Sequence, residues 1–280
     1  MINNEKLNRL KEIINNSDNI IFFGGAGVST ESGIPDFRGS NGLYNNKSDK
    51  PVEYYLSTDY FRYDTEEFFK FYKTNMNSLK AKPNIAHYFL TNLEKKGKLK
   101  AIITQNIDGL HQKAGSKNIL EIHGTIYKNH CISCYEKYDA KYVFSSKGIP
   151  RCKCGGIIKP EVVLYGESLT QDYDYAIRYI IKAKTLIVAG TSLTVEPASS
   201  LIRYFKGKDL IIINNDKTPY DYLATLVIHD KLGNVIKKLN SKWKHFGFFW
   251  IFILNRILDL MTYFILHILY FYVYSLTNIW

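Results

Sequence analysis

Cysteine is absent from most of this 280-residue chain, and its four cysteines all lie between positions 131 and 154. The sequence begins with a polar, charged segment, MINNEKLNRLKEIINNSDN, which has no apolar run before a small-residue cleavage site. It therefore lacks the features of a secretory signal, and we expect a cytoplasmic protein. A disulfide framework is not expected in that setting, and metal binding is the natural interpretation of the clustered cysteines.

Acidic residues are also few, since 26 Asp and Glu stand against 37 Lys and Arg and give a net charge of +11. A basic balance favours anionic partners, whether nucleotides, nucleic acid or an anionic membrane surface, without choosing among them. AT-rich coding would produce the same Lys-, Ile- and Asn-rich composition. With 46% hydrophobic and 22% charged residues, the composition is typical of a folded protein and excludes intrinsic disorder.

No internal repeat is visible, and apolar runs alternate instead with helical patterns. A short amphipathic helix is expected over residues 5–16, where Leu7, Leu10, Ile13 and Ile14 recur at helical spacing. Buried strands of the parallel-sheet type are expected within 19–27, 99–106, 157–167, 185–192 and 209–216. Further helices are expected over 64–79, 83–96, 171–183 and 197–206. This alternation predicts an α/β fold with a doubly wound parallel sheet.

Two segments interrupt the alternation. Residues 126–158 are rich in Cys, Gly, Lys and Tyr and are expected to form a small inserted module. Residues 241–280 are nearly all apolar and aromatic. We therefore divide the chain into a domain of residues 1–240, which carries the insertion, and a hydrophobic C-terminal tail of residues 241–280.

The cysteines form two close pairs. Two residues separate Cys131 from Cys134, and after 17 intervening residues come Cys152 and Cys154, which one residue separates. Two such pairs suit a tetrahedral four-cysteine zinc site, with each pair on its own turn. Four thiolates leave no open coordination position, so the zinc is expected to be structural.

A glycine-rich turn follows the first buried strand and reads GGAGVSTESGIPDFRG from Gly24 to Gly39. Glycines allow a close approach of the backbone to phosphates, and the amides of a following helix supply donors. Thr30 stands where the three-glycine dinucleotide fingerprint has its last glycine, so the turn alone is weak evidence. Phe37 could cover a ring, and Arg38 is a phosphate or carboxylate clamp, unless it is only a surface arginine in a loop.

Polar residues also follow the strand that ends near position 106. Asn106 and Asp108 come at a carboxyl end, where open α/β sheets bind ligands. His123, just before the cysteine module, is a candidate general base, because neutral histidine serves that role near pH 7. Taken alone, a histidine in the sequence EIHG is more often structural.

Taken together these motifs resemble the sirtuins, the NAD-dependent protein deacylases. The resemblance covers about residues 5–240 and rests on GAGVSTESGIPDFRG, TQNIDGLH, HG, the four cysteines, GTSLTVEPA and INNDKTP, in that order. It implies a zinc-containing enzyme that consumes NAD and in which His123 is the catalytic base beside Asn106 and Asp108. The NAD contacts that it implies are Gly25, Ala26, Gly27, Ser29, Thr30, Phe37, Arg38, Gln105, Asn106, Ile107, Asp108, His123, Gly190, Thr191, Ser192, Asn214, Asn215, Asp230 and Lys231.

The resemblance also implies a reaction and a substrate. The acyl-lysine oxygen would attack C1′ of the NAD ribose as nicotinamide leaves, and His123 would then remove a proton from the ribose hydroxyls. An acetylated protein would bind as an extended peptide between residues 162–167 and 193–198. An ADP-ribosyltransferase or an NAD-sensing protein would use the same pocket, whereas a zinc module for nucleic-acid binding would leave the glycine turn unexplained. No specific nucleic-acid partner is expected.

The sequence departs from the family pattern in two ways. Gly24 replaces the threonine that often precedes the glycine turn. Phe69 and Tyr72 stand where members that prefer succinyl- or malonyl-lysine carry a Tyr-x-x-Arg pair. A neutral acyl group is therefore expected, because an acidic one would be buried without a cation.

The tail lies outside the resemblance. Residues 257–276 have the length of a membrane span, but Asp259 and His267 lie within them and are costly in lipid. A non-native or poorly ordered extension, a membrane anchor and an apolar helix packed on the sheet all stay open. Membrane association would run through 257–276 only.

Overall fold

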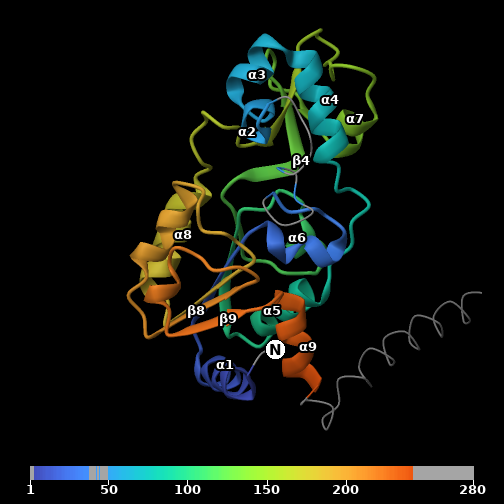
Figure 1. Ribbon diagram of the computed structural model, residues 1–280. Coiled ribbons are helices and arrows are strands. Elements are labelled where there is room, and N and C mark those ends of the chain that lie inside the picture. The colour runs from blue at the N-terminus through green and yellow to red at the C-terminus, as the bar shows by residue number, and fades with distance from the viewer. Residues whose placement is uncertain (1–2, 38–41, 43, 45–49, 242–280) are drawn as a thin grey trace, which may run out of the picture. The chain divides into compact units, whose positions relative to one another are not determined.

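The computed structural model describes residues 3–37, 42, 44 and 50–241 (Figure 1). Contacts divide the chain into two units, Met1–Ile236 and Lys237–Trp280, and every described strand belongs to the first unit. Within the described ranges no helix combines the length and the apolar content needed to cross a bilayer. The segment 257–276 and the rest of the tail beyond Ser241 lie outside these ranges.

Six parallel strands form the main sheet in the order β3-β2-β1-β7-β8-β9. Their bounds are β1 Ile20–Gly24, β2 Leu99–Thr104, β3 Ile119–Glu121, β7 Thr185–Ala189, β8 Asp209–Asn214 and β9 Leu226–His229. The chain starts in the middle, moves outward through β2 and β3, returns beside β1 at β7 and moves outward the other way. This is the strand order of a Rossmann fold, and the direction reverses between β1 and β7. The predicted doubly wound parallel sheet is confirmed.

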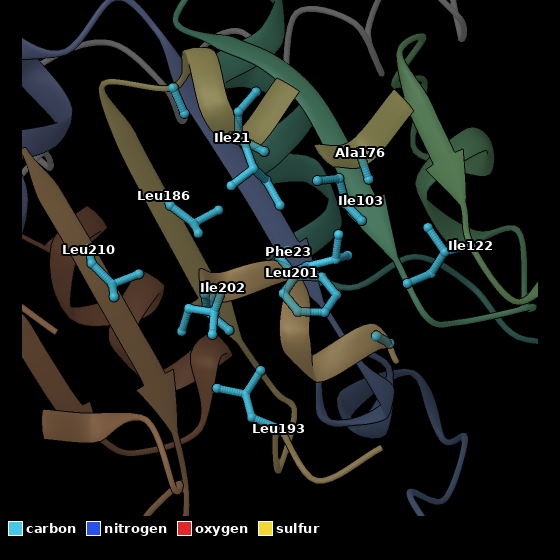
Figure 2. Close-up of a cluster of buried hydrophobic side chains, with 14 of the residues drawn as sticks. Ile21, Phe23, Ile103, Ile122, Ala176, Leu186, Leu193, Leu201, Ile202 and Leu210 are labelled. Carbon is cyan, nitrogen blue, oxygen red and sulfur yellow. The ribbon is translucent and has the colours of Figure 1, made fainter. Parts of the chain in front are cut away.

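Both faces of the sheet are covered, which explains why its strands are almost continuously apolar. Ile21 and Phe23 point to one face, where they join a buried cluster with Leu186, Leu210 and Leu201 (Figure 2). Helix α8 (Asp172–Lys182) and the 3-10 helix η4 (Ala198–Tyr204) close this face. On the other face, the ring of Phe22 lies edge-on to His111 of α6 (Leu110–Lys113).

Among the described residues, six further helices connect or flank the strands of the parallel sheet. They are α1 Asn4–Asn16, η1 Ala26–Val28, η2 Thr30–Ser32, α5 Ile85–Lys95, η5 Asp221–Leu223 and α9 Leu232–Ser241. Asparagine side chains cap the first turns of α1 and α5, since Asn3 and Asn84 each accept from a backbone amide two residues later. The helices predicted over 5–16, 83–96, 171–183 and 197–206 are found, the last as a 3-10 helix.

A second, antiparallel sheet of three strands carries the cysteines, with the order β5-β4-β6. Its strands are β4 Gly124–Cys131, β5 Lys137–Tyr138 and β6 Ile158–Val162. The inserted module is thus somewhat longer than the predicted residues 126–158. The strand predicted within 157–167 for the parallel sheet is β6 of this antiparallel sheet, so that prediction was wrong in the kind of sheet.

Helices from earlier in the chain complete this module. They are α2 Val52–Tyr55, α3 Thr58–Tyr63 and α4 Thr65–Asn75, which join α7 Ala140–Ser145 around the second core (Figure 1, top). Phe68 and Tyr72 of α4 are fully buried beside Val143 and Ile158. The helix predicted over 64–79 therefore packs on the cysteine module and not on the parallel sheet.

Candidate functional site

The first part of the site is the cofactor loop, which we define as residues Gly25–Gly33 after β1. The Gly27 amide donates to the Gly190 carbonyl after β7 at 2.8 Å. A Cβ atom on Gly27 would lie 2.7 Å from the Gly190 Cα, and Gly190 itself has a φ of 60°. Only glycine allows this contact between the two loops. The predicted glycine-rich turn therefore lies at the point where the strand order reverses, which is the ligand-binding edge of such sheets.

A buried hydrogen-bond network joins this loop to the end of β2. The Ser29 hydroxyl donates to Asp108 Oδ2 at 2.6 Å, and Leu110 N donates to Asp108 Oδ1 at 2.9 Å. Asn106 Nδ2 donates to Ser29 Oγ and to the Gly25 carbonyl, both at 3.1 Å. Burial raises the pKa of Asp108, while the hydrogen bonds from Ser29 and Leu110 lower it. The structure thus brings together three residues that lie in two separate sequence motifs.

His123 is joined to the same edge through Gln105. Gln105 Nε2 donates to Thr191 Oγ1 at 3.1 Å, and His123 Nδ1 lies 3.1 Å from the Gln105 carbonyl oxygen. A carbonyl oxygen only accepts, so we assign the proton of the neutral ring to Nδ1, which leaves a lone pair on Nε2. Burial lowers the pKa of His123, and the hydrogen bond to Gln105 opposes that shift. The ring is half-buried and is neutral at pH 7, as a general base requires.

A sharp turn between the two sheets positions His123. β3 ends at Glu121 and β4 begins at Gly124, whose φ is 74°. A Cβ on Gly124 would lie 2.0 Å from the carbonyl oxygen of Glu161, so a larger residue there would push β4 away from β6. The His123 carbonyl accepts from Val163 N at 2.9 Å. The cysteine module is therefore attached directly beside the candidate base.

Other predicted NAD contacts follow neighbouring strand ends. Ser192 pairs with Thr194 through their hydroxyls at 2.8 Å, and Asn214 Nδ2 donates to the Asp216 carbonyl at 2.9 Å. Asp230 Oδ1 accepts from Lys231 N at 2.7 Å and from Asn234 Nδ2 at 2.9 Å, at the start of α9. The ends of β7, β8 and β9 lie on one edge because the strands are parallel.

The last predicted contacts lie in or beside the loops already described. Ala26 is in η1, and Thr30 Oγ1 donates to the Gly27 carbonyl at 3.1 Å. Asn215 Nδ2 donates to Asp216 Oδ1 at 3.3 Å, and the Ile107 carbonyl accepts from Ile126 N at 3.1 Å. The Phe37 ring packs 6.2 Å from the Tyr44 ring. Arg38 lies outside the described residues, and the NAD role of every residue in this set stays a prediction.

The four cysteines converge as their spacing predicted. Their sulfur atoms all lie within 4.8 Å of one another, and the pairs Cys131–Cys154 and Cys134–Cys152 are 3.5 Å apart. A tetrahedral zinc with bonds of about 2.3 Å would separate its sulfur ligands by about 3.8 Å. The donor set therefore fits one structural zinc ion, and Ser133 N donates to Cys131 Sγ at 3.4 Å beside it.

One group near the cofactor loop was not predicted from the sequence. Asn84, in the sequence KPNIAH, caps α5 and also donates to Val28 and Ser32 of the loop. An asparagine just before an apolar helical pattern signals a helix start, but nothing local indicates a second set of partners 56 residues away.

Comparisons with known proteins agree with this geometry. The model of the Sir2 family matches residues 25–197. The NAD-dependent protein deacetylase of Clostridium perfringens (strain 13 / Type A) is 55% identical over 240 residues, which cover 84% of this chain and 98% of that protein.

Solved structures of Sir2 are similar as well. One, described as Sir2 with p53 peptide and NAD⁺, has a TM-score of 0.75 and 37% identity, covering 86% of this chain and 99% of that chain. Another, of Sir2 with the inhibitor EX-527, 2′-O-acetyl-ADP-ribose and deacetylated p53 peptide, has a TM-score of 0.75 and 36% identity, covering 85% and 99%. This chain therefore belongs to the Sir2 family, the NAD-dependent protein deacetylases.

Proposed function

We propose that this chain removes a neutral acyl group, acetyl above all, from lysine side chains of proteins, with His123 as the general base. The observation that carries the proposal is the hydrogen bond from His123 Nδ1 to the Gln105 carbonyl, which leaves Nε2 free to take a proton. The lowered pKa of His123 keeps that nitrogen unprotonated near pH 7.

The other residues of the network position the reacting groups and stabilise the charge that develops on them. NAD, when bound, supplies a ribose carbon that accepts the acyl oxygen and a nicotinamide that leaves. Asn106 and Ser29 hold the cofactor loop against Asp108, which fixes the donors and acceptors before any ligand arrives. Fixed dipoles of this kind stabilise developing charge without reorganisation.

The substrate is proposed to be an extended peptide that adds a strand between residues 162–167 and 193–198. Tyr165 and Thr194 are exposed in these two segments, which supports their availability to a partner. The Sir2 structures described above contain peptides of p53. We propose action in the cytoplasm, where four reduced thiols remain available for zinc, and no specific nucleic-acid binding. Any membrane association through 257–276 concerns residues outside the described ranges.

A product assay tests the proposal. The full chain is incubated with NAD and a peptide carrying one acetyl-lysine, and the products are separated by mass. We expect nicotinamide, deacetylated peptide and O-acetyl-ADP-ribose in equal amounts. Transfer of ADP-ribose onto the peptide would show an ADP-ribosyltransferase instead, and NAD binding without turnover would show a sensor.

A further inference from the structure

We propose that Asn84 is a positioning residue that holds the cofactor loop in register for NAD, an inference that rests on the proposed function. Asn84 Nδ2 donates to the Val28 carbonyl at 2.8 Å and to Ser32 Oγ at 3.0 Å. Both acceptors lie in the cofactor loop, one on each side of Ser29. A single amide group therefore fixes the segment that presents Ser29 to Asp108.

Asn84 is itself held firmly. Its Oδ1 accepts from Ala86 N at 2.9 Å, which caps α5, and its backbone N–H donates to His87 Nδ1 at 3.2 Å. The amide cannot rotate away from the loop without losing the cap, because oxygen and nitrogen would exchange places. The side-chain amide and the backbone N–H of Asn84 thus all bond either to the helix or to the loop.

A chain of contacts through α5 and α6 also links Asn84 back to Ser29. The ring of His87 packs against the ring of His111, with centroids 4.8 Å apart, and both side chains are almost completely buried. His111 lies on α6, three residues after Asp108, and Asp108 accepts from Ser29. The position of Ser29 is therefore determined from two sides, through Asp108 and through Asn84.

An aspartate at position 84 separates the two roles of the asparagine. Aspartate caps helices as well as asparagine does, so the start of α5 is preserved. A carboxylate only accepts, so the Val28 carbonyl loses its donor and faces a negative charge. Asn84→Asp therefore breaks the bond to Val28 while the helix cap is kept, and the Ser32 hydroxyl can turn to donate to the carboxylate. Asn3→Asp is the matched control, because Asn3 caps α1 by the same bond and does not contact the loop.

The test measures binding and kinetics on the full chain. We expect Asn84→Asp to weaken the affinity for ADP-ribose, measured by titration calorimetry, and to raise KM for NAD, each roughly tenfold for the lost hydrogen bond to Val28 and the negative charge placed against that carbonyl. KM for the acetylated peptide and the zinc content should stay as in the wild type. Ser32→Ala, which removes one acceptor only, should shift the same two constants less, and Asn3→Asp should shift neither.

Two outcomes would overturn the inference. Wild-type affinity for ADP-ribose in both Asn84→Asp and Ser32→Ala would show that Asn84 acts only as a helix cap. Should Asn84→Asp fail to fold, unchanged constants in a folded Ser32→Ala would have the same meaning. A wild-type chain that does not bind ADP-ribose would instead overturn the proposed function, and the inference with it.

Discussion

His123 is the single side chain on which turnover should depend most. We expect His123→Ala to lower kcat for deacetylation by on the order of 10²–10⁴, because the general base is lost. The ring is only half-buried, so zinc content and the urea midpoint should change little. His130→Ala is the control, since His130 lies on β4 with its Nδ1 3.4 Å from a carboxylate oxygen of Glu161, away from the network. Wild-type turnover in a folded His123→Ala protein would contradict the mechanism.

The fall of kcat/KM on the acid side of its pH profile should report protonation of His123. Burial places the folded pKa of His123 below its ordinary value of 6.5. The base is active when neutral. Protonation of His123 should therefore not affect kcat/KM near pH 7 and should lower it only below pH 6.5. A profile of kcat/KM between pH 5 and 8 checks this. A midpoint above 7 would show that His123 is mostly charged at neutral pH and contradict its assignment.

Acyl preference is expected to depend on two residues of α4. Phe69 and Tyr72 are fully buried, and the adjacent cation, Lys73, donates to oxygens of Ser146 and Gly148. A succinyl carboxylate beside Phe69 and Tyr72 would be desolvated without a partner, at a cost of several kcal/mol. We therefore expect kcat/KM on succinyl-lysine peptide to be roughly a hundredfold or more below that on acetyl-lysine peptide. Similar values on both would mean that another cation serves the acyl group.

At the scale of elements, the contact between α5 and α6 should make the fold sensitive to acid. Burial lowers the pKa of His87 to about 4 and that of His111 to about 3, from 6.5. The unfolded chain therefore takes up these protons first, so the stabilisation is complete above pH 6.5 and is lost as pH falls. At pH 5 the free energy of unfolding should be lower than above pH 6.5 by roughly 2 kcal/mol for each histidine.

Urea unfolding at pH 8 and pH 5 measures this loss. His111→Gln should reduce the difference between the two pH values by roughly one histidine's share. An equal pH dependence in wild type and His111→Gln would place the acid sensitivity elsewhere.

The antiparallel module should depend on its metal. We expect about one zinc ion per chain by metal analysis, and loss of stability in Cys131→Ser and Cys152→Ser, because structural zinc contributes folding energy. Cys131 and Cys152 are both part of the second core, so the loss should extend to α4. Soluble, active protein without zinc would refute the assignment.

For the whole molecule, we expect catalysis to be independent of the C-terminal tail. Every predicted site residue precedes position 240, and the unit Met1–Ile236 contains all of them. A chain that ends at Ser241 should therefore be soluble, bind zinc and deacetylate peptide at a rate within a few-fold of the full chain. Folded but inactive protein would mean that the tail contributes to the site.

The order of motifs in the sequence was sufficient for the family, the parallel sheet and the zinc ligands. Buried strands such as Ile20–Gly24 and Thr185–Ala189 can be recognised in the sequence because both faces of the sheet are covered, so nearly every position is apolar. The edge strands Ile119–Glu121 and Leu226–His229 were missed because three or four residues carry no periodic signal. The cysteines were found because metal ligands come in close pairs along the chain.

Other features required the tertiary structure. Ser29 and Asp108 are 79 positions apart, and Asn84 and Val28 are 56 apart, so no local pattern relates them. The partner of α4 was also undecidable from its sequence, because an apolar stripe specifies that a helix is buried but not against which sheet. By itself the sequence determined the family and predicted which residues carry the chemistry. Only the folded chain decided which of them meet, because hydrogen bonds and packing act between atoms that are close in space and not in sequence.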